Sequence, residues 1–226
     1  MTRRRRSTAL LLALGVSAAG SVRAGGLASE HEQALYAIGV RLGRSLAPFA
    51  LGEDELETVL RGVRDTALGR ELAVNETAQQ SRIDALLHER RTAAIAAERA
   101  AGAAFLERAA REPGALRTSS GAVLVELRAG TGPAPGPGDR VRLHYHGRLR
   151  DGNAFDSSVE RGTSVELAVS KALPCWREGL LRMRVGGKSR LTCPAELAHG
   201  QAGDPPRVPG GAAVVYEVEL LEIVAP

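Results

Sequence analysis

The chain has 226 residues, of which 44% are hydrophobic and 25% charged, and its formal net charge is +4 at pH 7. This length allows one large domain or two small ones. The excess of positive charge lies in residues 1–24, which hold five arginines and no acidic residue, so the rest of the chain has 25 of the 30 basic residues against 26 acidic ones, a net charge of −1. That remainder has no basic footprint, and we therefore exclude a nucleic-acid-binding protein.

Residues 1–24 have the layout of a secretory signal peptide. Arg3 to Arg6 precede an apolar run at 9–19, and small residues stand at the minus-three and minus-one positions of a cleavage site after Ala24. The apolar run is too short to span a bilayer. We expect export with cleavage near Ala24, and an uncleaved membrane anchor is the main alternative.

Helices are predicted from residue 29 to about residue 111. Ser29 and Glu32 form a capping box at the start of the first helix, and apolar residues recur at helical spacing over 53–68 to give the second. Asn75 is the predicted N-cap of a third helix that runs to about Arg111. At 1.5 Å per residue this helix would be about 50 Å long.

The first two helices hold too few large apolar residues for a core of their own, and pairing with a second copy of the chain would supply the missing partner surface. We therefore expect a helical dimerisation domain at 25–74 and a long connecting helix at 75–112. A small self-contained helical bundle is the alternative.

After Pro113 and Gly114 the pattern changes to antiparallel strands, which fill a domain at 113–226. Apolar residues alternate with small or polar ones, and Gly/Pro-rich turns separate the strands. The residues expected to face the core are Val123, Val125 and Leu127, then Val141, Leu143 and Tyr145, and finally Val214, Tyr216, Val218 and Leu220. A short helix at 174–183 interrupts them, with Trp176, Leu180 and Met183 on one side. The predicted fold class is α+β, an antiparallel sheet that wraps a short helix and follows an all-α arm.

The segment HYHGRLRDGNAFDSS at 144–158 is the best candidate for a functional site. In a chain with seven aromatic residues, it brings Tyr145 and Phe155 near Asp156, and Trp176 follows in the short helix. These residues predict an aromatic-walled pocket with a single carboxylate, suited to a small apolar group.

Strand alternation separates this pocket from a tempting metal motif. If Tyr145 faces the core, then His144 and His146 face away from it, toward solvent. We therefore interpret the HxH pair as surface histidines and expect neither a metal nor a cofactor.

Three segments together resemble the FKBP-type peptidyl-prolyl cis-trans isomerase domain. They are YHGRLRDGNAFDSS at 145–158, ALPCWREGLLRMRVGGKSRLTCPAELAHG at 172–200, and VVYEVELLEI at 214–223. The helical region, with YAIGVRLG at 36–43, is similar to the dimerisation arm of periplasmic FKBP-type foldases of the macrophage infectivity potentiator (Mip) and FkpA type.

The resemblance implies a periplasmic homodimer of a Gram-negative bacterium, with outer-membrane association left open. Its activity would be peptidyl-prolyl cis-trans isomerisation (EC 5.2.1.8) on proline-containing unfolded or exported polypeptides, together with chaperone activity and without a cofactor. Rotation about the X–Pro bond breaks no covalent bond, so the pocket needs only to favour the twisted amide. A chaperone that binds proline segments with little turnover is the leading alternative, and a domain that presents the helical arm to a partner is a weaker one.

The resemblance also implies roles for individual residues. Trp176 would form the pocket floor, with Tyr145, Phe155 and Tyr216 as walls and with Ala172, Leu173 and Val208 completing the lining. Asp156 and the Tyr145 hydroxyl would orient the twisted amide, and the N–H of Leu173 would hold a substrate carbonyl. Tyr145 or another polar side chain nearby should satisfy the Asp156 carboxylate.

Three positions depart from the family pattern. His199 stands where a tyrosine that reaches over the pocket is usual, Val165 replaces a common phenylalanine, and Ala172 is smaller than the usual valine. All three belong to the expected substrate-binding set, and their changes predict reduced affinity for macrolide inhibitors such as rapamycin.

The two cysteines, Cys175 and Cys193, would both be exported to an oxidising compartment, where an even number favours a disulfide. Two isolated buried thiols are the alternative. In the family, glycine is frequent at the position of Cys175, and the strand that carries Cys193 would run beside the start of the Trp176 helix. A bond between them would then join the pocket floor to the sheet.

Overall fold

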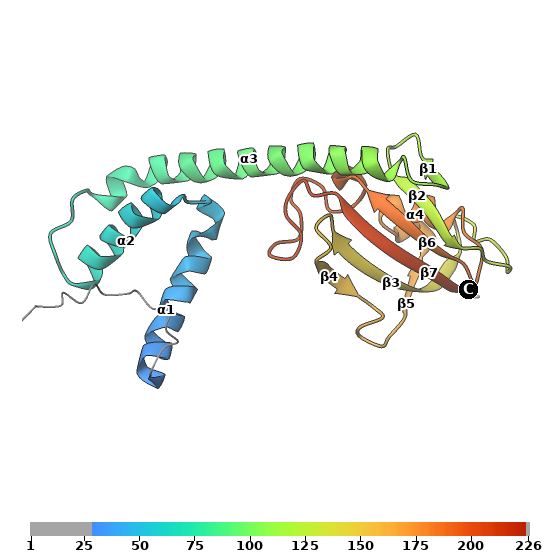
Figure 1. The fold of residues 1–226 in the computed structure, drawn as a ribbon, viewed down its shortest axis with the longest axis horizontal. Coiled ribbons are helices and arrows are strands. Elements are labelled where there is room, and N and C mark those ends of the chain that lie inside the picture. Colours follow the sequence, from blue (N-terminus) through green and yellow to red (C-terminus); the bar gives the residue numbers. More distant parts are fainter. Residues whose placement is uncertain (1–28, 225–226) are drawn as a thin grey trace, which may run out of the picture. The chain divides into compact units, whose positions relative to one another are not determined.

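A computed structural model describes residues 29–224 of the chain (Figure 1). The signal peptide predicted at 1–24 lies outside the described residues. The chain separates into two units, one up to Ala47 and one from Pro48 onward, and each is described by itself. Among the helices of residues 29–224, none combines the length and the apolar character needed to cross a membrane.

The first unit is the helix α1, Glu30–Leu46, which begins at the predicted capping box. The Ser29 hydroxyl accepts a hydrogen bond from the Glu32 N–H at 3.1 Å, and the Glu32 carboxylate accepts one from the Ser29 N–H at 3.0 Å. No residue of α1 is buried. The short 3-10 helix η1, Ala47–Phe49, follows it.

The second unit begins with the helices α2, Glu53–Ala67, and α3, Glu76–Ala109. Gly69, with φ of +64°, follows the end of α2, and the Asn75 side chain caps α3 by accepting from the Ala78 N–H at 3.1 Å. A salt bridge of 2.5 Å between Arg90 and Glu55 joins the two helices. The three predicted helices are therefore present, with ends within two residues of the expected ones.

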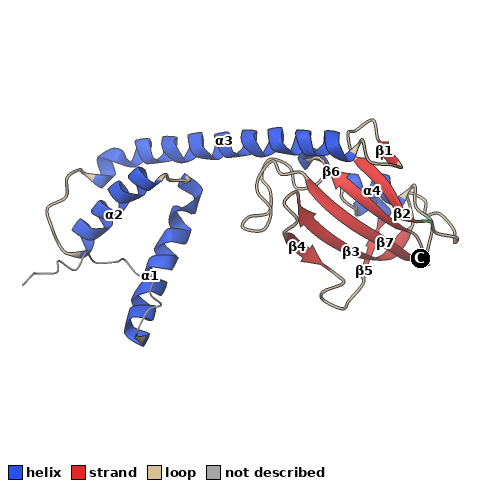
Figure 2. Ribbon diagram, in the orientation of Figure 1, coloured by secondary structure: helices blue, strands red, loops and turns tan. Residues whose placement is uncertain are grey.

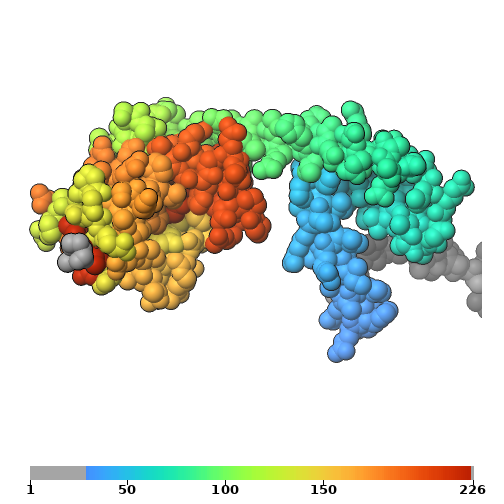
Figure 3. Space-filling model, turned by 180° about the vertical axis from the view of Figure 1, so that it is seen from behind, coloured from blue at the N-terminus to red at the C-terminus, as the bar shows by residue number. Residues whose placement is uncertain are grey.

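A seven-stranded antiparallel sheet forms the body of the C-terminal region (Figure 2), which packs into one continuous mass in the yellow to red part of Figure 3. The strand order is β1-β2-β6-β7-β3-β4, and β5 pairs with β3. The helix α4 and two short 3-10 helices, η2 and η3, interrupt the strands. The bounds are β1 Ala115–Arg117, β2 Val123–Arg128, β3 Arg140–Leu149, β4 Ala154–Ser157, β5 Val165–Ala168, η2 Val169–Lys171, α4 Pro174–Leu180, β6 Lys188–Cys193, η3 Ala195–Leu197 and β7 Val214–Val224.

The core lies between α4 and the two central strands, β3 and β7. Their alternation is as predicted, since the core-facing residues of both strands are fully or almost fully buried, namely Val141, Leu143, Tyr145, Val214, Tyr216, Val218 and Leu220. Trp176, Leu180 and Met183 pack against them from the α4 side. This arrangement confirms an α+β fold in which a sheet wraps a short helix.

The prediction for β2 was wrong. Val123, Val125 and Leu127 do not form one core face, because Leu124 joins the main core whereas Val123 packs with Leu106 and Ala109 of α3. Leu127 is 44% exposed. The physical reason is that α3 covers the outer face of β2 at its start, so both faces of the strand are apolar there. The alternation of apolar residues therefore does not tell which face of the strand points to the main core.

The C-terminal end of α3 packs against the sheet region through ion pairs and a close backbone approach. Arg150 donates two hydrogen bonds to Glu98, at 3.1 and 3.3 Å, and Arg99 forms a salt bridge of 2.7 Å with Glu196. A Cβ on Gly102 would lie 3.0 Å from the Ala213 Cβ, so glycine permits this close approach.

Candidate functional site

A cavity of about 250 Å³ opens over α4, and most of its lining was predicted from the sequence. Eight of the lining residues belong to the predicted site, namely Tyr145, Phe155, Asp156, Ala172, Leu173, Trp176, His199 and Tyr216. The other four are Leu167, Lys171, Asp204 and Arg207.

The aromatic side chains around this cavity pack against one another at an angle. The ring centroids of Tyr145 and Trp176 are 4.9 Å apart, and those of Trp176 and Tyr216 are 5.0 Å apart with the rings nearly perpendicular. The ring centroids of Phe155 and Tyr216 are 5.7 Å apart, with the rings nearly perpendicular. Such tilted contacts hold each ring in one orientation, which gives the pocket rigid apolar walls.

Gly147 of β3 makes this packing feasible. A Cβ at that position would lie 2.8 Å from the Phe155 Cζ and 3.0 Å from the Tyr216 Cε1. Any larger residue would therefore displace two walls of the pocket.

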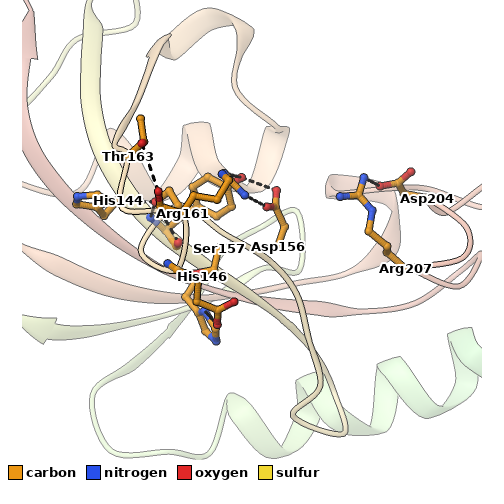
Figure 4. A network of polar contacts seen from close by, with 11 residues as sticks. His144, His146, Asp156, Ser157, Arg161, Thr163, Asp204 and Arg207 are labelled. Carbon is orange, nitrogen blue, oxygen red and sulfur yellow. Dashed lines mark hydrogen bonds and ion pairs between the residues drawn. The ribbon is translucent and has the colours of Figure 1, made fainter.

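The Asp156 carboxylate is held by two partners, as Figure 4 shows in part. The Tyr145 hydroxyl donates a hydrogen bond to it, and the Arg161 guanidinium forms an ion pair with it. Arg161 also donates to the Tyr145 hydroxyl at 2.9 Å. Burial opposes ionisation of Asp156, but the hydrogen bonds from Tyr145 and Arg161 outweigh it, so the pKa lies below its ordinary value. The carboxylate is therefore ionised at neutral pH.

The Tyr145 hydroxyl keeps its proton for the same reasons. Burial and the hydrogen bond to Asp156 raise the pKa of Tyr145 above its ordinary value of 10.0. Its backbone is fixed as well, since the Ser158 Oγ accepts from the Tyr145 N–H at 2.8 Å. Arg161 completes this arrangement and was not predicted, because a turn arginine five residues after Asp156 has no periodic signature.

His199 lies in the cavity wall, beside Tyr216 and Phe155. Its Nε2 is 2.8 Å from the Tyr216 hydroxyl, and its ring meets that of Phe155 edge-on with centroids 5.7 Å apart. Burial lowers the pKa of His199 below its ordinary value of 6.5 and raises that of Tyr216. A neutral imidazole and a neutral phenol therefore form this side of the pocket.

The start of α4 supplies the floor. Leu173 is the N-cap residue of α4, and N–H groups at a helix start have no acceptor within the helix. Trp176 is 7% exposed, and its Nε1 has no hydrogen-bond partner among residues 29–224. The pocket floor therefore consists of the Trp176 ring beside the start of α4, where backbone N–H groups have no acceptor within the helix.

Two predicted lining residues are not in the cavity wall. Val208 is fully buried and belongs to the hydrophobic core. An antiparallel bridge pairs it with Asp204, at the two ends of a tight turn. Val165 pairs with Leu143 across the sheet and packs partly buried on the same core. Both residues pack on the hydrophobic core, and their contact with a substrate stays a prediction.

A disulfide joins Cys175 and Cys193, whose Cα atoms are 5.8 Å apart. Both cysteines are fully buried. Since Cys175 directly precedes Trp176 and Cys193 ends β6, the bond links the pocket floor to the sheet.

The two histidines of the HxH motif lie on the outer side of β3, but they are half-buried where exposed side chains were expected. The His144 Nδ1 is 3.1 Å from the Ser158 Oγ, and the His146 Nδ1 is 3.7 Å from Glu160. The turn after β4 therefore covers them. In the described part of the chain, no three His, Cys, Asp or Glu side chains are grouped so that they could hold a metal ion.

Comparison with known proteins matches both regions of the chain. A family model described as FKBP-type peptidyl-prolyl cis-trans isomerase matches residues 132–221, and one described as the domain amino terminal to it matches residues 31–123. The FKBP-type 22 kDa peptidyl-prolyl cis-trans isomerase of Escherichia coli K12 is 39% identical over 85% of this chain and 95% of its own length. FkpA of the same strain is 30% identical over 86% of this chain and 76% of its own length. The crystal structure of Escherichia coli FkpA superposes with a TM-score of 0.67 at 30% identity, covering 88% of this chain and 98% of that one.

Proposed function

This chain belongs to the FKBP-type peptidyl-prolyl cis-trans isomerase family, and we propose that it catalyses X–Pro isomerisation of exported polypeptides in the cavity over Trp176. The barrier to this rotation, about 18–20 kcal/mol, comes from amide resonance. A twisted amide has lost that resonance and part of its charge separation, so an apolar site favours it over the planar forms. The walls of Tyr145, Phe155 and Tyr216 around the Trp176 floor supply such a site.

The polar groups of the pocket orient the substrate. The Tyr145 hydroxyl and the Asp156 carboxylate are fixed to each other and to Arg161, so they present oriented charge at one side of the proline site. The N–H of Leu173 at the start of α4 would hold a carbonyl of the substrate chain. Preorganised groups of this kind stabilise the twisted state without reorganising.

The observation that carries the proposal is the ionised Asp156 held within an aromatic wall, and a double variant tests it. In a proline tetrapeptide assay we expect Phe155→Ala with Asp156→Val to lower kcat/KM at least about tenfold, roughly 1.4 kcal/mol of activation free energy. Val159→Ala is the control, because Val159 is 59% exposed on the next turn and outside the lining. A wild-type protein without isomerase activity would overturn the proposal.

The same assay, paired with suppression of aggregation, addresses chaperone activity. Loss of isomerisation with aggregation suppression retained would place the two roles in separate parts of the chain. The alternative function, a chaperone that binds proline segments with little turnover, predicts aggregation suppression with little isomerisation by the wild type. Reduced macrolide affinity would follow from the replacements at Val165, Ala172 and His199.

We further propose that residues 1–24 direct export to the periplasm, since the relatives include Gram-negative FkpA proteins. Residues 25–74 would form the dimerisation domain, 75–112 the connecting helix and 113–226 the isomerase domain. The match to the amino-terminal family model and the exposed apolar side chains of α1 support dimerisation through the N-terminal helices.

A further inference from the structure

The charged groups around the cavity are paired with one exception. Arg161 pairs with Asp156, and on another part of the rim Arg207 pairs with Asp204 at 2.6 Å (Figure 4). Lys171 also lines the cavity, but within residues 29–224 it forms no salt bridge and no side-chain hydrogen bond. The rim therefore carries one positive charge more than its carboxylates neutralise.

Lys171 has a defined place on the rim of the cavity. It is the last residue of η2 and comes directly before Ala172 and Leu173, which line the pocket. The backbone around it is anchored, because Val169 is fully buried and its N–H donates to the Asp139 carbonyl at 2.9 Å. The ammonium is exposed at the end of a flexible side chain, so it can follow a charge on a bound polypeptide without disturbing the pocket.

We propose that Lys171 is a specificity-determining residue, which makes the enzyme favour an acidic over a basic side chain next to the proline. The inference rests on the proposed function, because it concerns the same pocket. A carboxylate on the bound segment would meet a rim cation that has no partner among residues 29–224, whereas a lysine at the same place would be repelled. An exposed ion pair of this kind corresponds to a preference of about two- to fivefold.

Two series of proline tetrapeptides test this preference with the full-length protein. One series places Glu, Gln or Lys before the proline, and the other places them after it. For the wild type we expect kcat/KM to be higher for Glu than for Lys, by about two- to fivefold, in at least one series. Lys171→Gln should bring that ratio near one, and Lys171→Glu should invert it.

The controls separate this effect from changes in overall charge or fold. Arg177→Gln removes an exposed cation of α4 that lies outside the cavity lining, and we expect it to leave the Glu/Lys ratio unchanged. The wild-type ratio should also shrink as the salt concentration rises, since exposed charges are screened. Circular dichroism of each variant reports its fold.

The results distinguish the two proposals. If the wild type accelerates every peptide and Lys171→Glu leaves the Glu/Lys ratio unchanged in both series, Lys171 does not determine specificity, and the proposed function stands. If the wild type accelerates no peptide at all, both proposals fail.

Discussion

Asp156 shows how a carboxylate stays charged inside an aromatic wall. Burial alone would raise its pKa, but the hydrogen bonds from Tyr145 and Arg161, the charge of Arg161 and a backbone hydrogen bond at Ser157 lower it and keep the carboxylate ionised. The same contacts hold the Tyr145 hydroxyl in one orientation, so the three side chains act as one unit.

His199 should make the activity depend on pH in the mildly acidic range. Burial holds its pKa below 6.5, so the imidazole is neutral at pH 7 and gains a proton only in more acidic solution. Protonation would place a charge against Phe155 and Tyr216 and would leave the Nε2 able only to donate to the Tyr216 hydroxyl oxygen. From about pH 7.5 to about pH 5 we expect kcat/KM to fall by roughly threefold or more.

The charged groups that face His199 are Asp204, Asp156 and Arg207, and their partial cancellation leaves burial as the main cause. The unfolded chain binds this proton more readily than the folded one. The stability contributed by neutral His199 is therefore full above pH 6.5 and is lost as the pH falls through the lowered pKa.

The control for the predicted loss of activity in acid is a pH–rate profile of His199→Tyr. If kcat/KM of that variant falls equally in acid, His199 is not the group that causes the fall.

Some site residues could be predicted from regular structure, whereas Ala172, Leu173 and His199 were predicted from the resemblance to the family. Tyr145 and Tyr216 follow from strand alternation, and Trp176 follows from the helical spacing of α4. Arg161 and Arg207 come from turns, and Lys171 comes from the three-residue helix η2, which is too short for a period to tell which way a side chain points. Val208 shows the converse, because an apolar loop residue can equally well line a pocket or fill the core below it.

At the level of elements, the docking of α3 depends on small residues. Gly102 lies over Ala213, and Leu106 and Ala109 pack with Val123 beside it. This contact was not predicted, because an alanine-rich helix has no clear apolar face and because Val123 was assigned to the other side of its strand.

Gly102→Val should weaken this docking and lower the stability of the isomerase domain. Even the Cβ would be 3.0 Å from that of Ala213, so the helix or the segment around Ala213 must shift, at a cost of about 1–3 kcal/mol in unfolding free energy. Denaturant unfolding measures the loss.

Ala104→Val in the same helix is the matched control. Ala104 is exposed, so this change costs only helix propensity, at most about 0.7 kcal/mol. Propensity alone would make the control the less stable variant, because valine is a better helix former than glycine and a worse one than alanine. If Ala104→Val unfolds first, the proposed role of Gly102 is wrong.

For the molecule as a whole, the exposed apolar side chains of α1 indicate that this helix packs against a partner. Leu35, Ile38 and Leu42 recur at spacings of three and four residues and are 54%, 55% and 47% exposed. A stripe of this kind on a helix without buried residues is unfavourable in water. The sequence predicted this from the shortage of large apolar residues in the first two helices.

We expect Ile38→Glu to convert a dimer into a monomer at micromolar concentration, because the new carboxylate would be buried without a partner in the interface. Sedimentation velocity reports the change. Ala37→Glu is the control, since it adds the same charge at the adjacent residue, on another face of the helix.

The tetrapeptide activity should persist in the Ile38→Glu monomer, because every residue of the pocket lies in the second unit of the chain. Suppression of aggregation should fall, since two pockets on one dimer hold an unfolded chain by effective concentration. A wild type that sediments as a monomer would show that α1 covers its apolar face in another way. The proposal that residues 25–74 form a dimerisation domain would then be wrong.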